Sequence, residues 1–179
     1  MTATAADILI GEHVTLWPYV RSECARDLLY VFWNAVEQAG DWPRLLWGDP
    51  AKGDLTSWVQ YISASYDPKI LLFATDPQDA LAGLIWYHRI RDGEAHGAVW
   101  VEPGHRGKAS REIVKIGCRY MGEIFHIHTI WAETPWPEAR NLIHRCGFEQ
   151  VAAVDGYRTV GEEKRRTYLM KLNQENLYA

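Results

Sequence analysis

The sequence has no long apolar run, few cysteines and no excess of basic residues, and each of these absences excludes a class of protein. No apolar stretch reaches the ~18 residues that a membrane-spanning helix requires. The first residues also lack a basic segment followed by a long apolar one, which is the pattern of an export signal. We therefore expect a soluble, cytoplasmic protein without a membrane partner.

The cysteines form neither a disulfide framework nor a metal-ligand pattern. Cys24, Cys118 and Cys146 are odd in number, lie far apart and fall in apolar segments, a usage that fits a reducing compartment. His126 and His128 have the spacing of two ligands on a strand, but no third ligand type clusters beside them. We expect no metal site.

The charge balance argues against a nucleic-acid partner. The formal net charge is −4 and the isoelectric point is near 6.0, so no general positive field attracts a phosphate backbone.

Nine tryptophans are many for this length, and large aromatic side chains often line a groove or a partner surface. They leave open a protein partner or a homodimer.

The length and the hydrophobic content indicate one domain spanning residues 1–179. The 179 residues lie within the ~100 to 200 that are typical of a single domain, and a hydrophobic content of 47% suffices for one core. Neither an internal repeat nor a linker-like composition interrupts the chain. The order of the secondary-structure elements is therefore the main clue to the fold.

Hydrophobic periodicity and turn residues predict the element order βααβββαβαββ. The predicted strands are Val14 to Trp17, Lys69 to Thr75, Leu81 to Arg89, Ala95 to Val101, Thr129 to Glu133, Glu149 to Val154 and Thr167 to Leu172. The predicted helices begin at Ser22, Asp54, Ser110 and Pro137. Two longer loops are expected, at Asp41 to Gly53 and at Asp155 to Arg166.

A basic turn containing glycines joins a predicted strand to a predicted helix at Pro103 to Arg111. The free N–H groups of a first helical turn, together with the helix dipole, favour a phosphate at such a place. The side chains of Arg106, Lys108 and Arg111 would strengthen this preference. A plain basic turn would have the same composition. The position of the turn in the fold must therefore decide between a phosphate site and a plain turn.

In element order and in two local motifs, the sequence resembles the GCN5-related N-acetyltransferase family. In that family a strand leads into R/Q-x-x-G-x-G/A, whose amides hold the pyrophosphate of acetyl-CoA. The segment RGKASR keeps the leading Arg106 but has Ala109 for the first motif glycine and Arg111 for the final small residue. The resemblance implies acetyl-CoA as cosubstrate, bound by Arg106, Gly107, Lys108, Ala109, Ser110 and Arg111.

The second motif is PEARNLIHRCGF, from Pro137 to Phe148, which resembles the closing helix of the family with its terminal Gly-Phe. Trp136 stands where an Asn is common, and Ile143 stands where many members have a Tyr that acts as general acid. The opening segment GEHVTLWPYV is similar to the start of amino-terminal and ribosomal-protein acetyltransferases.

The resemblance implies an α/β (α+β) fold in a single domain, with a mixed, mostly antiparallel, splayed sheet of about seven strands and about four flanking helices. The strands at Ala95 to Val101 and at Thr129 to Glu133 would diverge, with the pantetheine arm of the coenzyme between them. Backbone groups of Val99 and Val101 would pair with that arm like an added strand.

Acetyl transfer requires a neutral amine, so the candidate catalytic residues are those that can accept a proton near the splay. We expect His96 and Glu133 in this role, with Glu94 and His88 close by. A histidine has an unperturbed pKa near 6.5, which suits the task, although a hydrogen-bonded structural histidine is a common alternative. Glu133 could equally be a solvated carboxylate at the end of a strand.

Two functions remain open from the sequence. The first is an N-acetyltransferase that moves an acetyl group directly from acetyl-CoA to a primary amine of a small molecule or protein. The second is a non-catalytic binding or structural module with the same fold, which Arg111, Trp136 and Ile143 favour because they depart from the family pattern. An open slot in the splayed sheet is expected for the first function, and a filled one for the second. Trp42, Trp47 and Trp136 suggest an apolar or aromatic acceptor.

Overall fold

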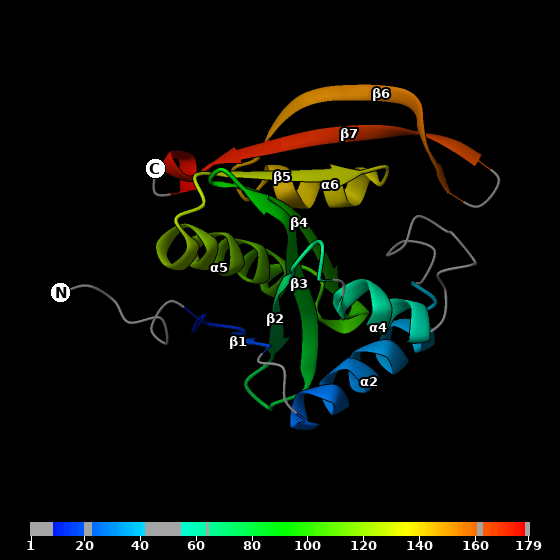
Figure 1. The fold of residues 1–179 in the computed structure, drawn as a ribbon, viewed down its shortest axis with the longest axis vertical. Coiled ribbons are helices and arrows are strands. Elements are labelled where there is room, and N and C mark those ends of the chain that lie inside the picture. Colours follow the sequence, from blue (N-terminus) through cyan, green and yellow to red (C-terminus); the bar gives the residue numbers. More distant parts are fainter. Residues whose placement is uncertain (1–8, 20–22, 42–54, 64, 161–162, 178–179) are drawn as a thin grey trace.

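The computed structural model describes residues 9–19, 23–41, 55–63, 65–160 and 163–177, with side chains described except at 23–26 and 176–177. In this part of the chain, seven strands form one sheet in the order β1-β2-β3-β4-β5-β7-β6 (Figure 1). The strands are β1 (Thr15–Pro18), β2 (Ile70–Thr75), β3 (Leu81–Arg91), β4 (Glu94–Val101), β5 (Thr129–Thr134), β6 (Glu149–Val160) and β7 (Glu163–Asn173). The helices are α2 (Glu23–Gln38), α4 (Leu55–Ser63), α5 (Lys108–Phe125) and α6 (Pro137–His144), with short 3-10 turns η2 (Pro103–His105) and η3 (Gln174–Leu177).

The predicted fold class and element order are confirmed, because the described elements follow one another as βααβββαβαββ. Most boundaries shift by one to three residues, as expected where helix ends and strand ends fray. The proposed helix caps Ser22 and Asp54 lie outside the described residues, and so does the loop after Asp41 with Trp42 and Trp47.

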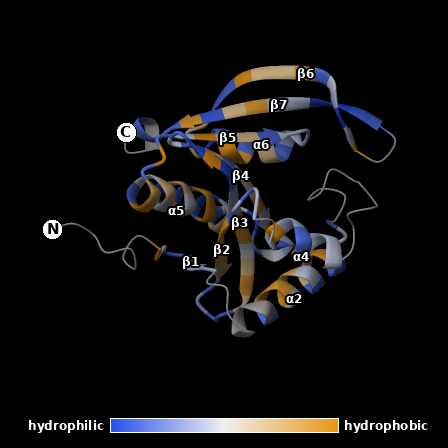
Figure 2. Cartoon of the chain, in the orientation of Figure 1, coloured by the Kyte–Doolittle hydropathy of each residue, from blue (hydrophilic) through white to orange (hydrophobic). Residues whose placement is uncertain are grey.

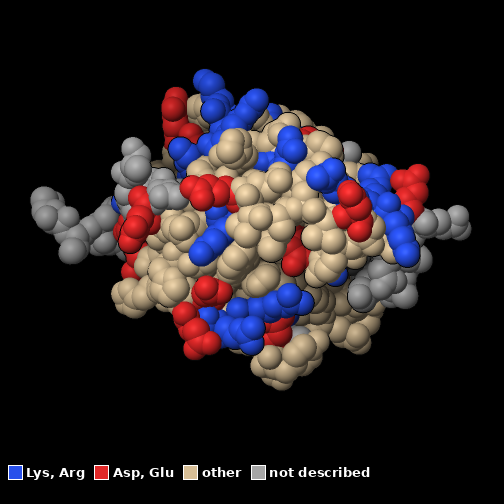
Figure 3. All heavy atoms as spheres, turned by 90° about the horizontal axis from the view of Figure 1, so that it is seen from above, with Lys and Arg blue, Asp and Glu red and all other residues tan. Residues whose placement is uncertain are grey.

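The prediction of a polar loop from Asp155 to Arg166 was wrong. Strand β6 extends to Val160 and β7 begins at Glu163, with Arg158 opposite Arg165 and Thr159 opposite Lys164. The hairpin lies beyond the main body of the sheet, so both of its faces are polar and the alternation that marks a strand is missing (Figure 1). Seen from above, its side of the molecule carries Lys, Arg, Asp and Glu side chains interspersed (Figure 3).

Helices cover the two faces of the sheet and divide the core. Helix α5 covers one face, where buried residues such as Ile113 and Met121 join Leu72 and Ile130. Helices α2 and α4 cover the other face and bury Phe32 and other aromatic side chains. Hydrophobic residues accordingly concentrate on β2 and β3 and along α2 and α5 (Figure 2). Within the described part of the chain, none of the helices is both long and apolar enough to cross a membrane.

The sheet is split between β4 and β5, as the resemblance implied. All other neighbouring strands pair in antiparallel fashion, whereas β4 and β5 are parallel and share three residue pairs, Glu94 with Thr129, Ala95 with Ile130 and His96 with Trp131. Beyond these pairs the two strands separate. Strand β7 pairs with every residue of β5. The sheet is therefore continuous where β4 and β5 pair, and open beyond His96 of β4.

The aromatic core under α2 generates a stability prediction. Phe32 is fully buried, and its ring centroid lies 5.2 Å from that of Trp58 and 5.4 Å from that of Trp100. We expect Phe32→Ala to lower the free energy of unfolding by about 3–5 kcal/mol, because it leaves a cavity among rigid rings. Urea unfolding followed by tryptophan fluorescence measures this. Tyr30→Ala on the exposed side of α2 is the control and should change the value by less than about 0.5 kcal/mol; equal effects of the two substitutions would contradict the packing described.

Candidate active site

A cavity of about 1560 Å³ lies where β4 and β5 separate. Its walls include Gly97 to Val101 of β4, Ala132 to Thr134 of β5 and the first turns of α5 and α6. It extends from Arg106 to Trp136, so the slot expected for a catalytic protein is open. A small-molecule site typically measures about 300–1,000 Å³, so this cavity has room for a second ligand.

The open edge of β4 presents backbone groups to this cavity. The N–H of Glu102 donates to the carbonyl oxygen of Ala82 on the β3 side, at 2.9 Å. Because successive residues of a strand direct their backbone groups to opposite edges, Val99 and Val101 direct theirs toward β5. The ladder to β5 ends at His96, so both residues lie beyond it and line the cavity. The carbonyl oxygen of Val101 accepts a hydrogen bond from Nε of Arg106 at 3.3 Å.

The turn before α5 has the geometry of an anion site. Gly107 is the N-cap residue, with φ 125° and ψ −112°, a conformation open to glycine and strained for other residues. Its N–H donates to Oγ of Ser110 at 3.1 Å. The N–H groups of Lys108, Ala109 and Ser110 occupy the first helical turn, where no helical acceptor exists. These three amides, rather than that of Gly107, are the groups the turn can offer to a phosphate.

The residues of the predicted coenzyme site mostly gather at the cavity. Those on its wall are Val99, Val101, Arg106, Gly107, Lys108, Ser110 and Arg111. Ala109 differs, because it lines a shallower hollow on the other side of the turn, beside Gly104 and His105. An alanine side chain there leaves its amide in the first helical turn, so the substitution removes no donor.

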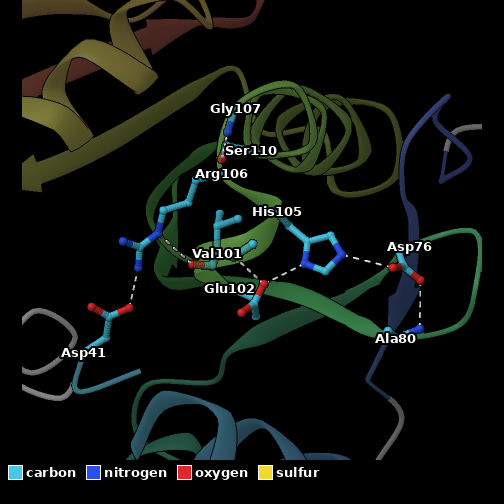
Figure 4. Close-up of polar contacts among 10 residues, drawn as sticks. Asp41, Asp76, Ala80, Val101, Glu102, His105, Arg106, Gly107 and Ser110 are labelled. Carbon is cyan, nitrogen blue, oxygen red and sulfur yellow. Dashed lines mark hydrogen bonds and ion pairs between the residues drawn. The ribbon is translucent and has the colours of Figure 1, made fainter. Parts of the chain in front are cut away.

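Arg106 is fixed by protein groups. Its Nη2 donates to Oδ2 of Asp41 at 2.5 Å, in addition to the bond from Nε to Val101. Asp41 is buried and also accepts a hydrogen bond from Nε1 of Trp100 at 3.0 Å. A guanidinium has five N–H donors, and these two bonds use two of them. The end of α2 is thereby tied to the turn that begins α5 (Figure 4).

His105 braces the opposite side of the turn (Figure 4). Its Nδ1 lies 2.8 Å from Oε2 of Glu102, and its Nε2 lies 3.0 Å from Oδ2 of Asp76 in the turn between β2 and β3. The hydrogen bond to Asp76, and then that to Glu102, raise the pKa of His105. The same hydrogen bond lowers the pKa of Asp76. The turn is therefore held from two directions.

Two histidines form the wall of the cavity at the other end of β4. His88 of β3 lies directly opposite His96 of β4, and their ring centroids are 5.7 Å apart. Burial lowers the pKa of His88 to about 4, although Asp67, with Oδ2 at 3.7 Å from Nδ1, opposes the shift. Burial also lowers the pKa of His96. Both imidazoles are therefore neutral at pH 7 and able to accept a proton.

The second candidate base, Glu133, also lines the cavity but is engaged in an ion pair. Nη2 of Arg158 donates to its Oε2 at 2.7 Å. The negative charge of Glu133 opposes the lowering of the pKa of His96, so it favours the protonated imidazole. The structure thus brings the two predicted catalytic residues to one wall, whereas Glu94 accepts a hydrogen bond from Nε1 of Trp131 at 3.0 Å.

Several cavity residues were not identified from the sequence. Tyr61 of α4 accepts a hydrogen bond from Nε1 of Trp86 at 3.4 Å, and the ammonium group of the buried Lys69 lies 4.3 Å from the centre of its ring. Arg89 lies at a bulge of β3, and Arg158 belongs to the segment that was predicted to be a loop. Tyr61 follows Trp58 by three residues, and this helical spacing is a signal that could have placed the two rings side by side.

The positions that depart from the family pattern also face this cavity. Ile143 is buried in its wall, so the place of the family tyrosine carries no hydroxyl group. Trp136 begins α6, and the guanidinium of Arg165 lies 4.5 Å from the centre of one of its rings. Cys118 and Cys146 are buried, and burial raises their pKa values to about 12 and about 11, so both are thiols that pack in the core.

Comparison with known proteins shows the fold. No protein-family model and no curated protein matches the sequence. Spermidine N-acetyltransferase from Vibrio cholerae, solved with CoA and spermine, superposes with a TM-score of 0.77 at 17% identity, over 94% of this chain and 100% of that chain. RimJ from Mycobacterium smegmatis, solved with CoA-disulfide, gives 0.70 at 18% identity, over 93% and 84%. The chain therefore has the fold of the GCN5-related N-acetyltransferases.

The depressed pKa of His88 generates a prediction about pH. Between pH 7 and 4.5 the unfolded chain binds a proton at His88 that the folded protein does not bind, because the pKa falls from 6.5 to about 4 on folding. The free energy of unfolding should therefore decrease as the pH falls through this window, by roughly 2 kcal/mol from this group. In His88→Gln this decrease should be smaller than in the wild type by that amount, as measured by urea unfolding at both pH values. Parallel pH curves for the two proteins would contradict it.

Asp41 generates a second prediction. Asp41→Ala removes the acceptor of both Trp100 and Arg106, and we expect the free energy of unfolding to fall by about 2 kcal/mol. Asp41→Asn retains an acceptor oxygen for Trp100 and is the matched control, with roughly half the loss. Urea unfolding measures both. Wild-type stability in Asp41→Ala would show that these bonds are not formed in solution.

Proposed function

We propose that this chain is an N-acetyltransferase that moves the acetyl group of acetyl-CoA directly to a primary amine. The observation that carries the proposal is the open cavity between β4 and β5, with a helix N-terminus at one end and two neutral imidazoles at the other. The CoA in the structures of similar fold supports the choice of cosubstrate.

The coenzyme would be held by the backbone and by basic side chains. Its pyrophosphate would bind the amides of Lys108, Ala109 and Ser110, where the helix dipole favours an anion. The side chains of Arg111 and Lys108 reach the same cavity. The pantetheine arm would lie along the open edge of β4 and pair with backbone groups of Val99 and Val101. Arg106, fixed by Asp41, would add a preoriented cation.

The acceptor would approach from the side of His88 and His96. The amine nitrogen forms a bond to the thioester carbonyl carbon, the C–S bond breaks, and CoA leaves as the thiol after its sulfur takes a proton. We assign the proton of the amine to His96, directly or through a water, because its imidazole is neutral at pH 7. Glu133, paired with Arg158, stabilises the imidazolium that forms.

The alternative function was a non-catalytic module in which side chains fill the splayed sheet. The open cavity supports the catalytic proposal over this alternative. Because Ile143 stands where the family pattern has a tyrosine, the leaving sulfur takes its proton from another group.

Calorimetric titration with acetyl-CoA tests the coenzyme part of the proposal. We expect micromolar binding that weakens at least tenfold in Arg111→Ala and in Arg106→Ala, because each removes a charge-assisted contact of about 1.5–3 kcal/mol. Arg119→Ala is the matched control, since Arg119 lies on the same helix, pairs with Glu123 and is absent from the described cavity wall. Wild-type protein that binds no acetyl-CoA at millimolar concentration would contradict the proposed function.

A further inference from the structure

We infer, resting on the acetyl transfer proposed above, that the acceptor is an amine with an anionic group a few bonds away, a carboxylate or a phosphate, and that Arg89 binds this anion. The backbone bulge that turns Arg89 into the cavity, and the groups that surround it there, support this inference. It concerns the acceptor end of the cavity, which we define as the part of its wall formed by α4 and by His88, Arg89 and His96. The basic residues assigned to the coenzyme lie at the other end and have no part in it.

Arg89 lies at a break in the regular pairing of β3 with β4. His88 pairs with His96 and Arg91 pairs with Glu94, and the register shifts between these two pairs. Arg89 has φ 51°, in the left-handed region that a residue with a Cβ atom adopts rarely. A residue held in this conformation costs stability, and such residues concentrate at binding and catalytic sites. The bulge is therefore a place to look for a function.

The bulge decides on which side of the sheet Arg89 lies. Side chains of a regular strand alternate between the two faces, so Arg89 would share a face with Ile85, against the core under α5. Instead Ile90 packs against that core, and Arg89 lines the cavity. Burial lowers the pKa of His96 most, and the positive charge of Arg89 is the next cause, so the guanidinium lies near that ring. A bulge that re-aims a side chain in this way brings the cation to the acceptor end.

Arg89 carries the permanent charge at the acceptor end. The other ionisable groups described there are two imidazoles and the phenol of Tyr61, all neutral at pH 7. Asp67 lies close by, but its Oδ1 accepts the backbone N–H of Arg89 at 2.7 Å, and its Oδ2 lies 3.3 Å from Nζ of Lys69. Among the described residues, no carboxylate forms an ion pair with the guanidinium of Arg89, which is exposed to the cavity. Such a guanidinium favours an anionic ligand, which its planar fork can bind through two oxygens.

Tyr61 offers a neutral donor beside this cation. Its hydroxyl oxygen accepts a hydrogen bond from Nε1 of Trp86 at 3.4 Å, and burial raises its pKa, so it keeps its proton. A hydroxyl that accepts one hydrogen bond still has its own O–H to donate. The ring of Tyr61 lies 4.3 Å from Nζ of Lys69, which binds Asp67, so contacts run unbroken from this ring to the backbone of Arg89. A guanidinium and a phenol together suit the oxygens of a carboxylate or a phosphate.

The imidazoles set the separation between the amine and the anion. We assigned the proton of the amine to His96, and the ring centroid of His96 lies 5.7 Å from that of His88, the residue before Arg89. An amine at His96 and an anion at Arg89 are therefore joined by a short chain. Amino acids and amino-phosphate compounds have this arrangement, whereas a polyamine has no anion to offer.

Matched pairs of acceptors test the inference in an assay of CoA thiol release from acetyl-CoA. The carboxylate probes are glycine, β-alanine and 4-aminobutanoate, each paired with the alkylamine of the same chain length, and the phosphate probe is O-phosphoethanolamine, paired with ethanolamine. We expect kcat/KM for at least one anionic amine to exceed that for its partner at least tenfold, because only the anion forms charge-assisted bonds. The carboxylate and phosphate probes show which anion the site takes. Equal or better turnover of every uncharged partner, or no turnover of any anionic amine, would overturn the inference, while acetyl-CoA binding by calorimetry would leave the coenzyme part of the proposed function standing.

A variant tests whether Arg89 is the group that binds the anion. In Arg89→Gln the ratio of kcat/KM for the preferred anionic amine to that for its partner should fall at least tenfold, mainly through a higher KM. Arg91→Gln is the matched control, because Arg91 lies on the same strand, is exposed and is absent from the described cavity wall. After burial, the charges of both arginines lower the pKa of His96, so the control also reports any effect of charge alone. An unchanged ratio in Arg89→Gln, or an equal fall in Arg91→Gln, would show that Arg89 does not bind the acceptor.

Discussion

The separation of β4 from β5 after three residue pairs is the constraint on which the rest of the structure depends. A strand edge inside a folded domain leaves N–H and C=O groups that must find partners in water or in a ligand. The sheet tolerates the gap because β5 is supported along its whole length by β7, and β4 by β3. The opening leaves a large cavity lined by Val99 and Val101. An extended ligand can form hydrogen bonds with the backbone groups of these two residues.

The turn at the mouth of this opening is braced from both sides. Arg106 is bound to Asp41 at the end of α2, and His105 is bound to Asp76 between β2 and β3. Both contacts fix side chains that would otherwise move, which lowers the entropic cost of binding an anion at the first turn of α5. The contacts of Asp41 with Arg106 and Trp100 join the end of α2 to β4 and to the turn that begins α5.

The fold was predictable from the sequence because periodicity and turn residues are local signals. The positions of the turn at Pro103 to Arg111 and of His96 and Glu133 beside the cavity also followed from the sequence, because the family resemblance places these segments beside the splay. Asp41 was missed as the partner of Arg106, because 65 residues separate them and no local pattern links them. Arg158 was missed because a hairpin that is polar on both faces lacks the alternation of a strand.

The most direct test of the account is an NMR titration of the 15N-labelled protein with acetyl-CoA, followed by amide shifts. The account predicts that the largest changes fall on Lys108, Ala109 and Ser110 at the anion turn and on Val99 and Val101 along the open edge of β4. Amides of β1, which lies at the sheet edge away from the cavity, should remain unchanged. Shifts that leave the turn and β4 unaffected, or no shifts at all, would contradict the claim that the splayed sheet is a coenzyme site.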